Sequence, residues 1–153
     1  MTAKHYWDSV SFLAWLQNEA GRIDGCRDTL ERAKSGEIVI VTSALTLTEV
    51  LWTKDGPRLP EDKAEKLNGF FRRSYIRVVN LDRSTAQKAQ KHVWNDGIKP
   101  KDSIHLATAL HLQCEFLETY DAHLLKKAGK FGSLIIQQPQ CKAQGSLDLR
   151  NVP

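Results

Sequence analysis

The chain has 153 residues, the length of one domain with a single core, and no apolar run of about 20 residues that could cross a bilayer. Its first residues lack the apolar segment of a signal peptide, and three cysteines without CxxC spacing suggest neither a zinc site nor a disulfide framework, so a cytoplasmic location is expected. The net charge of +4 is mildly basic and would suit a polyanionic partner such as a nucleic acid.

Strand-like and helix-like apolar patterns alternate along the chain, with glycine and proline between them. Because strands that alternate with helices form parallel sheets covered on both faces, the pattern predicts one three-layer α/β/α domain over residues 1–138 with a mostly parallel central sheet. A polar C-terminal tail over residues 139–153 is expected to be loosely attached. In chain order the expected elements are strand 4–8, helices 9–19 and 26–36, strand 37–43, helices 44–54 and 61–74, strand 75–79, helices 83–95 and 101–112, strand 114–120, helix 122–129 and strand 133–137.

Four acidic residues stand just past an expected strand or on an expected helix that starts at the same edge of the sheet. Asp8 and Asp121 each follow a strand, Asp102 lies on the first turn of its helix, and Glu49 lies on the helix after the most apolar strand. Helices that cover a parallel sheet run opposite to its strands, so all four acids are expected at the carboxyl edge, where α/β proteins gather ligands. Carboxylates crowded together repel one another unless cations lie between them. The pattern therefore predicts paired hard cations and phosphodiester hydrolysis.

Each acid also has a purely structural interpretation. Asp8 and Asp121 could be helix N-caps, and Asp102 could stabilise a helix N-terminus through its charge. Glu49 has no capping role; it could be a solvated surface residue, but its apolar neighbours indicate a buried helix on which a carboxylate needs a partner. His105 lies one turn beyond Asp102 on the same face, where it could bond a ligating carboxylate, touch substrate or be a satisfied core histidine.

Four stretches of the chain resemble, in this order, the four motifs of PIN-domain ribonucleases, which include VapC-type toxins: YWDSVSFLAWL, VTSALTLTEVL, KPKDSIHLATAL and ETYDAHLL. The resemblance runs from about Tyr6 to Ile136. It implies a PIN-like fold and a ribonuclease that depends on Mg²⁺ or Mn²⁺ and leaves a 5′-phosphate. In that family the matching acids bind the metal and are catalytic, and here they are Asp8, Glu49, Asp102 and Asp121.

The resemblance also assigns supporting residues and exposes two departures. Thr119 matches a small hydroxyl residue that often supports the last acid. Many members carry a further acid where this chain has His123, which implies weaker occupancy of a second metal site, and Ser or Asn where it has Val10. The residues expected to act in the second shell or on substrate are Ser9, His105, Thr119 and His123.

RNA is the substrate that the resemblance implies. Its backbone could be guided by basic residues, whose alternative role is a solvated charged face. Four tryptophans, Trp7, Trp15, Trp52 and Trp94, could stack on bases or pack in the core. The basic candidates are Arg72, Arg73, Arg77, Lys99 and Lys101.

The resemblance to toxins implies two protein partners. One is an antitoxin that inserts a segment into the acidic groove, and the other is a second copy of the chain, with helix 61–74 as a candidate dimer surface. Two alternatives remain open: a PIN-like module that binds RNA or protein without cutting it, and a 5′-nuclease that acts on structured DNA. Such 5′-nucleases usually carry additional acids and a helical arch, neither of which is seen in this sequence.

Overall fold

The computed structural model describes residues 2–52, 56 and 58–142, in which strands and helices alternate as predicted. In chain order the elements are β1 (Ala3–Trp7), α1 (Ser9–Leu16), α2 (Ile23–Lys34), β2 (Ile38–Ser43), α3 (Leu45–Glu49), α4 (Glu61–Phe71), β3 (Ile76–Val79), α5 (Arg83–Asp96), α6 (Pro100–His111), β4 (Phe116–Glu118), α7 (Ala122–Leu125) and β5 (Ile135–Gln137).

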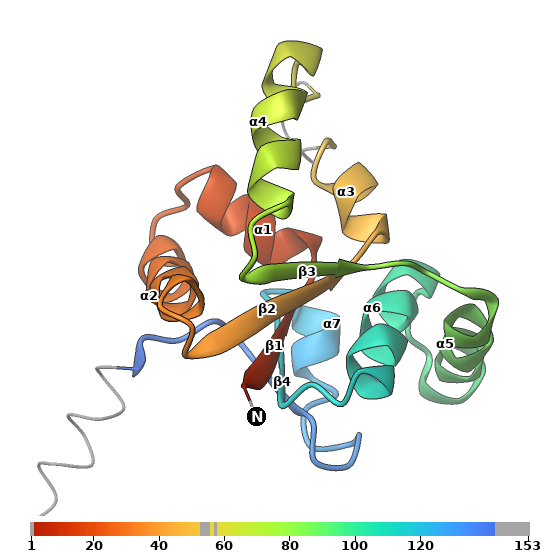
Figure 1. The fold of residues 1–153 in the computed structure, drawn as a ribbon. Helices are drawn as coiled ribbons and strands as arrows, with labels where there is room; N and C mark the ends of the chain where they lie inside the picture. Colours follow the sequence, from red (N-terminus) through yellow and green to blue (C-terminus); the bar gives the residue numbers. More distant parts are fainter. Residues whose placement is uncertain (1, 53–55, 57, 143–153) are drawn as a thin grey trace, which may run out of the picture.

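The five strands form one sheet in the order β3-β2-β1-β4-β5, and every neighbouring pair is parallel (Figure 1). β1 is the central strand, with Tyr6 opposite Val41 of β2 and Trp7 opposite Glu118 of β4. Its last residue directly precedes Asp8. The sheet therefore places Asp8 in the middle of its carboxyl edge, between the ends of β2 and β4.

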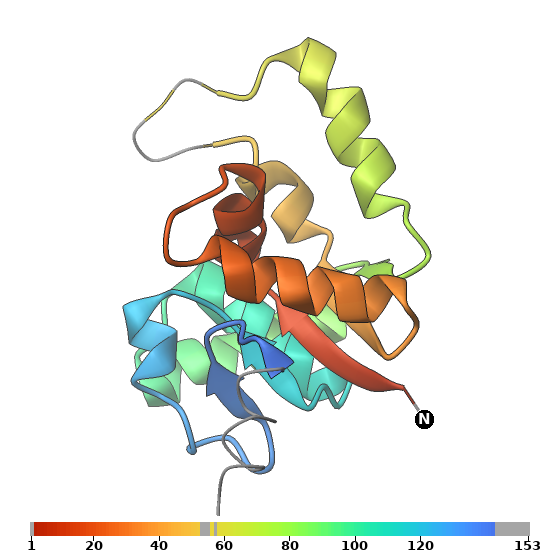
Figure 2. The ribbon, with the colours of Figure 1, turned by 90° about the vertical axis from the view of Figure 1, so that its left-hand side faces the viewer.

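Helices cover both faces of the sheet, which confirms the three-layer α/β/α architecture. Alternate residues of β1 point to opposite faces. Trp7 packs with residues of α1, α2 and α4 in one apolar core, and Tyr6 packs with residues of α6 and α7 in the other. Figure 1 shows the same division, with α5 beside α6, and Figure 2 shows α4 extending beyond the rest of the molecule. None of the helices in the described part of the chain is long and apolar enough to span a membrane.

Several helix boundaries differ from the predicted ones. α1, α4 and α7 end three or four residues before their predicted ends, at Leu16, Phe71 and Leu125. The differences in α3 and α2 have local causes.

α3 ends at Glu49, whereas the predicted helix runs to residue 54. Residues 53 and 54 of that predicted helix lie outside the described range. The β-branched residues Thr46, Thr48 and Val50 disfavour helix, and the chain after Glu49 closes tighter turns such as Trp52 N–H to Glu49 C=O.

α2 begins at Ile23, three residues before the predicted start at Cys26. Gly25 looks like a helix breaker in the sequence, but it lies inside α2. A Cβ atom on it would lie 2.2 Å from the carbonyl oxygen of Pro139, so only glycine allows this close approach.

The beginning of the predicted tail contacts α2. Arg32 donates to the carbonyl of Gln140 at 3.3 Å, and the backbone N–H of Lys142 donates to Asp28 at 3.0 Å. Residues 143–153 lie outside the described range. The domain boundary at residue 138 stays a prediction.

Candidate functional site

Asp8 is buried at the centre of the carboxyl edge, with 2% of its surface exposed. It is the N-cap of α1, where its Oδ1 accepts from the N–H of Ser11 at 3.2 Å, and its Oδ2 accepts from the hydroxyl of Thr119 at 2.5 Å. Burial raises the pKa of its carboxyl, with a smaller contribution from the charge of Asp121. Asp8 is therefore both a helix cap and a costly buried acid, and capping does not account for its burial.

Thr119 connects the first acid to the last one. Its hydroxyl donates to Asp8 and accepts from the backbone N–H of Asp121 at 3.0 Å. Asp121 in turn caps α7, since its Oδ1 accepts from the N–H groups of His123 at 2.7 Å and Leu124 at 3.3 Å. The hydroxyl predicted to support the last acid thus positions the Asp121 backbone and donates its own hydrogen bond to Asp8.

Asp102 lies half-buried in the first turn of α6, which begins at Pro100 as expected for proline at a helix start. Burial, together with the charges of Asp121 and Asp8 and a smaller one from Glu49, raises the pKa of its carboxyl to about 6. Carboxylates influence one another to this extent only over short distances. The structure therefore brings the four predicted acids to one rim of the sheet.

The side chain of Glu49 is bonded to His105 of α6. Its Oε1 lies 2.6 Å from Nε2 of His105, and Nδ1 of the same imidazole lies 2.6 Å from the hydroxyl of Tyr6. His105 is 1% exposed, whereas the Glu49 side chain is 15% exposed. The predicted partner of the carboxylate is thus present. It lies one helical turn from Asp102, as the spacing indicated.

The two remaining predicted residues lie near the acids without entering a side-chain bond to them. Ser9 is buried as the first residue of α1, and His123 is exposed on α7, where its backbone N–H donates to Asp121. Their predicted roles toward metal or substrate stay predictions.

The acidic rim has the donor chemistry that Mg²⁺ and Mn²⁺ prefer, namely carboxylate oxygens. The described residues contain no group of three or more His, Cys, Asp or Glu side chains already arranged around a common ion position. The proximity of the acids is therefore a property of the fold, and metal ligation by them is a prediction.

The basic candidates divide between the two edges of the sheet. Lys99 and Lys101 are exposed beside Asp102 at the start of α6. Arg72 and Arg73 lie between α4 and the start of β3, at the amino edge, and Arg77 is the second residue of β3. Only the lysines are placed next to the acids.

The sequence interpretation gave no role to Tyr6 or Glu118. Tyr6 stands two residues before Asp8 on a strand, so alternation places both side chains on the same side, and this was the available signal. Glu118 is 1% exposed and accepts from Nε1 of Trp7 at 3.0 Å, with Nδ1 of His5 also at 3.0 Å. No local pattern predicts this contact, since His5 and Glu118 are far apart in the chain.

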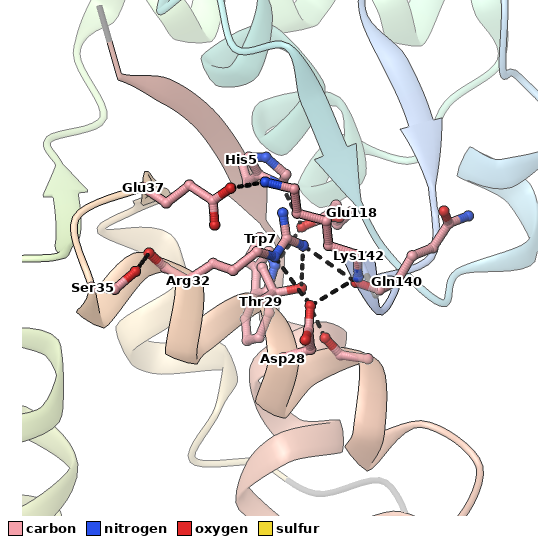
Figure 3. A network of polar contacts seen from close by, with 11 residues as sticks. His5, Trp7, Asp28, Thr29, Arg32, Ser35, Glu37, Glu118, Gln140 and Lys142 are labelled. Atoms are coloured by element: carbon pink, nitrogen blue, oxygen red, sulfur yellow. Dashed lines mark hydrogen bonds and ion pairs between the residues drawn. The ribbon is translucent and has the colours of Figure 1, made fainter. Parts of the chain in front are cut away.

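Figure 3 shows the surroundings of Glu118, on the α2 face of the sheet. The network there includes Arg32, which bonds Asp28 at 3.1 Å, and Lys142, which pairs with Glu37. It borders an open cavity of about 530 Å³ lined by His5, Arg32, Glu37, Glu118 and Lys142 among other residues. None of the four rim acids lines this cavity.

Comparisons with known proteins agree with this architecture. The family model of the PIN domain matches residues 6–130. VapC20 of Mycobacterium tuberculosis, a toxin that cleaves the sarcin–ricin loop, has a TM-score of 0.61 at 16% identity, over 77% of this chain and 90% of that one. Among curated proteins, none matches the chain.

Two further solved structures share the fold. A chain of a toxin–antitoxin complex from Klebsiella pneumoniae has a TM-score of 0.58 at 19% identity, over 86% of this chain and 95% of that one. VapBC2 from Rickettsia felis, bound to a DNA fragment from its promoter, has a TM-score of 0.61 at 17% identity, over 88% of this chain and 98% of that one. The strand order brings the acids to one rim of the sheet. Because the family model covers most of the chain, the chain belongs to the PIN domain family.

Proposed function

We propose that this protein is an endoribonuclease that hydrolyses RNA phosphodiester bonds at the acidic rim, with Asp8, Glu49, Asp102 and Asp121 as its catalytic acids. The observation that carries the proposal is the meeting of the acids at one edge of the sheet: Thr119 joins Asp8 to the backbone of Asp121, and α6 both carries Asp102 and holds Glu49 through His105. The raised pKa of Asp102 agrees with this crowding of carboxylates, which has a stability cost that a structural role does not explain. Membership of the PIN family supports ribonuclease chemistry at this site.

Divalent ions fit this donor set, and Asp8, Asp102 and Asp121 would hold them, with Glu49 either ligating or orienting a bound water. When bound, such ions activate water and stabilise the oxygen that leaves phosphorus. Water adds to phosphorus as the P–O3′ bond breaks, which leaves a 5′-phosphate and a 3′-hydroxyl. The chain itself fixes the acids through the Thr119 and His105 contacts.

The test is a cleavage assay on total RNA with the purified protein in Mn²⁺ or Mg²⁺. Cleavage should appear with either ion, disappear in EDTA, return when the ion is restored, and leave 5′-phosphate ends. Tight RNA binding without turnover in Mn²⁺ would instead support a non-cleaving module, for which His123 in place of an acid is the motivating feature. Preference for a DNA flap over RNA would point to a 5′-nuclease.

We further propose an antitoxin partner, because two of the similar solved structures are toxin–antitoxin assemblies. A partner segment that covers the acidic rim would stop cleavage by excluding RNA. If a short reading frame lies directly upstream, its product should form a complex with this protein and suppress cleavage. Full activity in the presence of that product would contradict the assignment.

The lysines beside Asp102 should bind the RNA backbone. We expect Lys99→Ala with Lys101→Ala to weaken RNA binding and to lower the slope of log affinity against log salt by about 2, roughly one per phosphate contact. The maximal rate should change little, because neither lysine is assigned to the chemistry. The measurement is fluorescence anisotropy with labelled RNA across a salt series.

Lys34→Ala is the matched control for that series. Lys34 is exposed at the C-terminus of α2, whose direction places it at the amino edge, away from the acids. A salt slope that falls equally in both variants would mean that RNA binding is not concentrated at the acidic rim.

A further inference from the structure

A buried chain of hydrogen bonds connects Glu49 to the central strand. The N–H of Ser43 donates to the Tyr6 hydroxyl at 3.2 Å, that hydroxyl lies 2.6 Å from Nδ1 of His105, and Nε2 of His105 lies 2.6 Å from Oε1 of Glu49. Tyr6 is 0% exposed and His105 is 1% exposed. The chain joins β2, β1, α6 and α3, four elements that are distant in sequence.

The hydrogen-bond inventory fixes the direction of this chain. The Tyr6 oxygen already accepts from Ser43, so its own proton is free to go to Nδ1 of His105. The imidazole then carries its proton on Nε2 and donates it to the Glu49 carboxylate. Burial raises the pKa of Tyr6 well above its usual range, which keeps the hydroxyl protonated and able to donate.

The opposite arrangements leave a group unsatisfied. If Nδ1 carried the only ring proton, Nε2 would face the Glu49 carboxylate with two acceptors 2.6 Å apart. If both nitrogens carried protons, the Tyr6 oxygen would accept twice and its own proton would have to go to the Thr42 hydroxyl, which is already bonded to the Trp7 carbonyl and the Thr46 hydroxyl. A neutral imidazole protonated on Nε2 satisfies Tyr6, His105 and Glu49 together.

Glu49 needs this support because its own helix is short. α3 has five residues, and Glu49 is the last of them. A helix of this length holds a side chain poorly by itself, whereas α6 has 12 residues and packs on the sheet. The bond to His105 therefore lets the longer helix α6, rather than the short helix α3, fix the position of the Glu49 side chain.

We propose that Tyr6 and His105 are positioning residues that hold Glu49 as a carboxylate at the acidic rim, with Oε1 bonded to His105 and Oε2 left for the divalent ion or its water. The inference rests on the proposed function, because it gives Glu49 a fixed place toward the metal. Outer partners that orient ligating groups in this way typically change metal affinity or activity by roughly 10–100-fold when removed.

Tyr6→Phe tests the relay with the smallest change, because it removes one oxygen from the core. In calorimetric titration of the metal-free protein, Mn²⁺ affinity should fall about tenfold or more. Nitrogen NMR of the His105 ring should show the proton on Nε2 in the wild type and a mixture of both tautomers in the variant. Tyr75→Phe, which removes a hydroxyl from a half-buried tyrosine of the other core, should leave both readouts unchanged.

Two substitutions of His105 separate positioning from packing. Gln can still donate to Glu49 and Leu cannot, so His105→Gln should bind Mn²⁺ more tightly than His105→Leu, even if both lower thermal stability. Wild-type Mn²⁺ affinity in Tyr6→Phe, or equal affinities in the two His105 variants, would overturn the relay alone. A wild-type protein that neither binds Mn²⁺ nor cleaves RNA would overturn the proposed function and the relay with it.

Discussion

Asp102→Asn should abolish RNA cleavage and at the same time stabilise the metal-free protein. Loss of one ligating carboxylate removes several kcal/mol of charge stabilisation in the transition state, which corresponds to about a hundredfold or more in rate. Stability should move the other way, because the pKa of Asp102 is about 6 in the fold against an ordinary value of 3.8. The folded state holds this proton more tightly, so wild-type stability falls as the pH rises from about 4 to about 6.

The asparagine variant has no carboxyl at this position and so does not lose stability over this pH range. Its free energy of unfolding should therefore equal that of the wild type at pH 4 and exceed it by the full amount above pH 6. Thermal unfolding at both pH values, without metal and with Mn²⁺, measures it, and added Mn²⁺ should raise the melting temperature of the wild type far more than that of the variant. Asp24→Asn is the matched control, since Asp24 is an exposed first-turn acid of α2. A cleaving Asp102→Asn, or one destabilised at pH 7.5, would contradict this account of the rim.

Thr119→Val should damage stability and activity together. The change keeps the shape of the side chain but removes the hydroxyl that donates to Asp8 and accepts from the N–H of Asp121. Leaving such groups unpaired in the interior costs about 1–3 kcal/mol. Cleavage should fall by roughly 10–100-fold, because the first and last acids lose their common support. Urea unfolding of the metal-free protein measures the loss of stability, and cleavage rates at saturating Mn²⁺ measure the loss of activity.

Thr108→Val provides the comparison for that change. Thr108 is 4% exposed on α6, and its hydroxyl donates to the carbonyl of Ile104 within the same helix. Removing this bond leaves a carbonyl that the helix already uses, so little stability should be lost. If Thr119→Val proves as stable and as active as Thr108→Val, the link between Asp8 and Asp121 has no functional weight.

The common rim of the acids could be predicted because it follows from chain direction alone. Asp8 and Asp121 follow strands, and Asp102 lies in the first turn of a helix that must run against them, so their meeting requires no knowledge of side-chain packing. The end of α3 could not be predicted in this way. Helix ends depend on small local preferences, and Thr46, Thr48 and Val50 tip the balance at Glu49.

The contacts that support the acids were beyond sequence reasoning for a different reason. The bond between Tyr6 and His105 depends on how α6 packs against β1. The burial of Glu118 depends on His5 and Trp7 from a neighbouring strand. Such pairings are set by tertiary packing over separations of about a hundred residues. A buried polar residue in a strand signals that a partner exists without identifying it.

The most direct measurement of the central claim is anomalous scattering from crystals grown with Mn²⁺. The account predicts at least one anomalous peak at the carboxyl edge, about 2.0–2.2 Å from carboxylate oxygens of Asp8, Asp102 or Asp121, with Glu49 bound directly or through a water. The peak should disappear in Asp102→Asn crystals grown identically. Ordered carboxylates with no peak between them, or Mn²⁺ bound only elsewhere, such as beside Glu118, would contradict the assignment of this rim as the metal site.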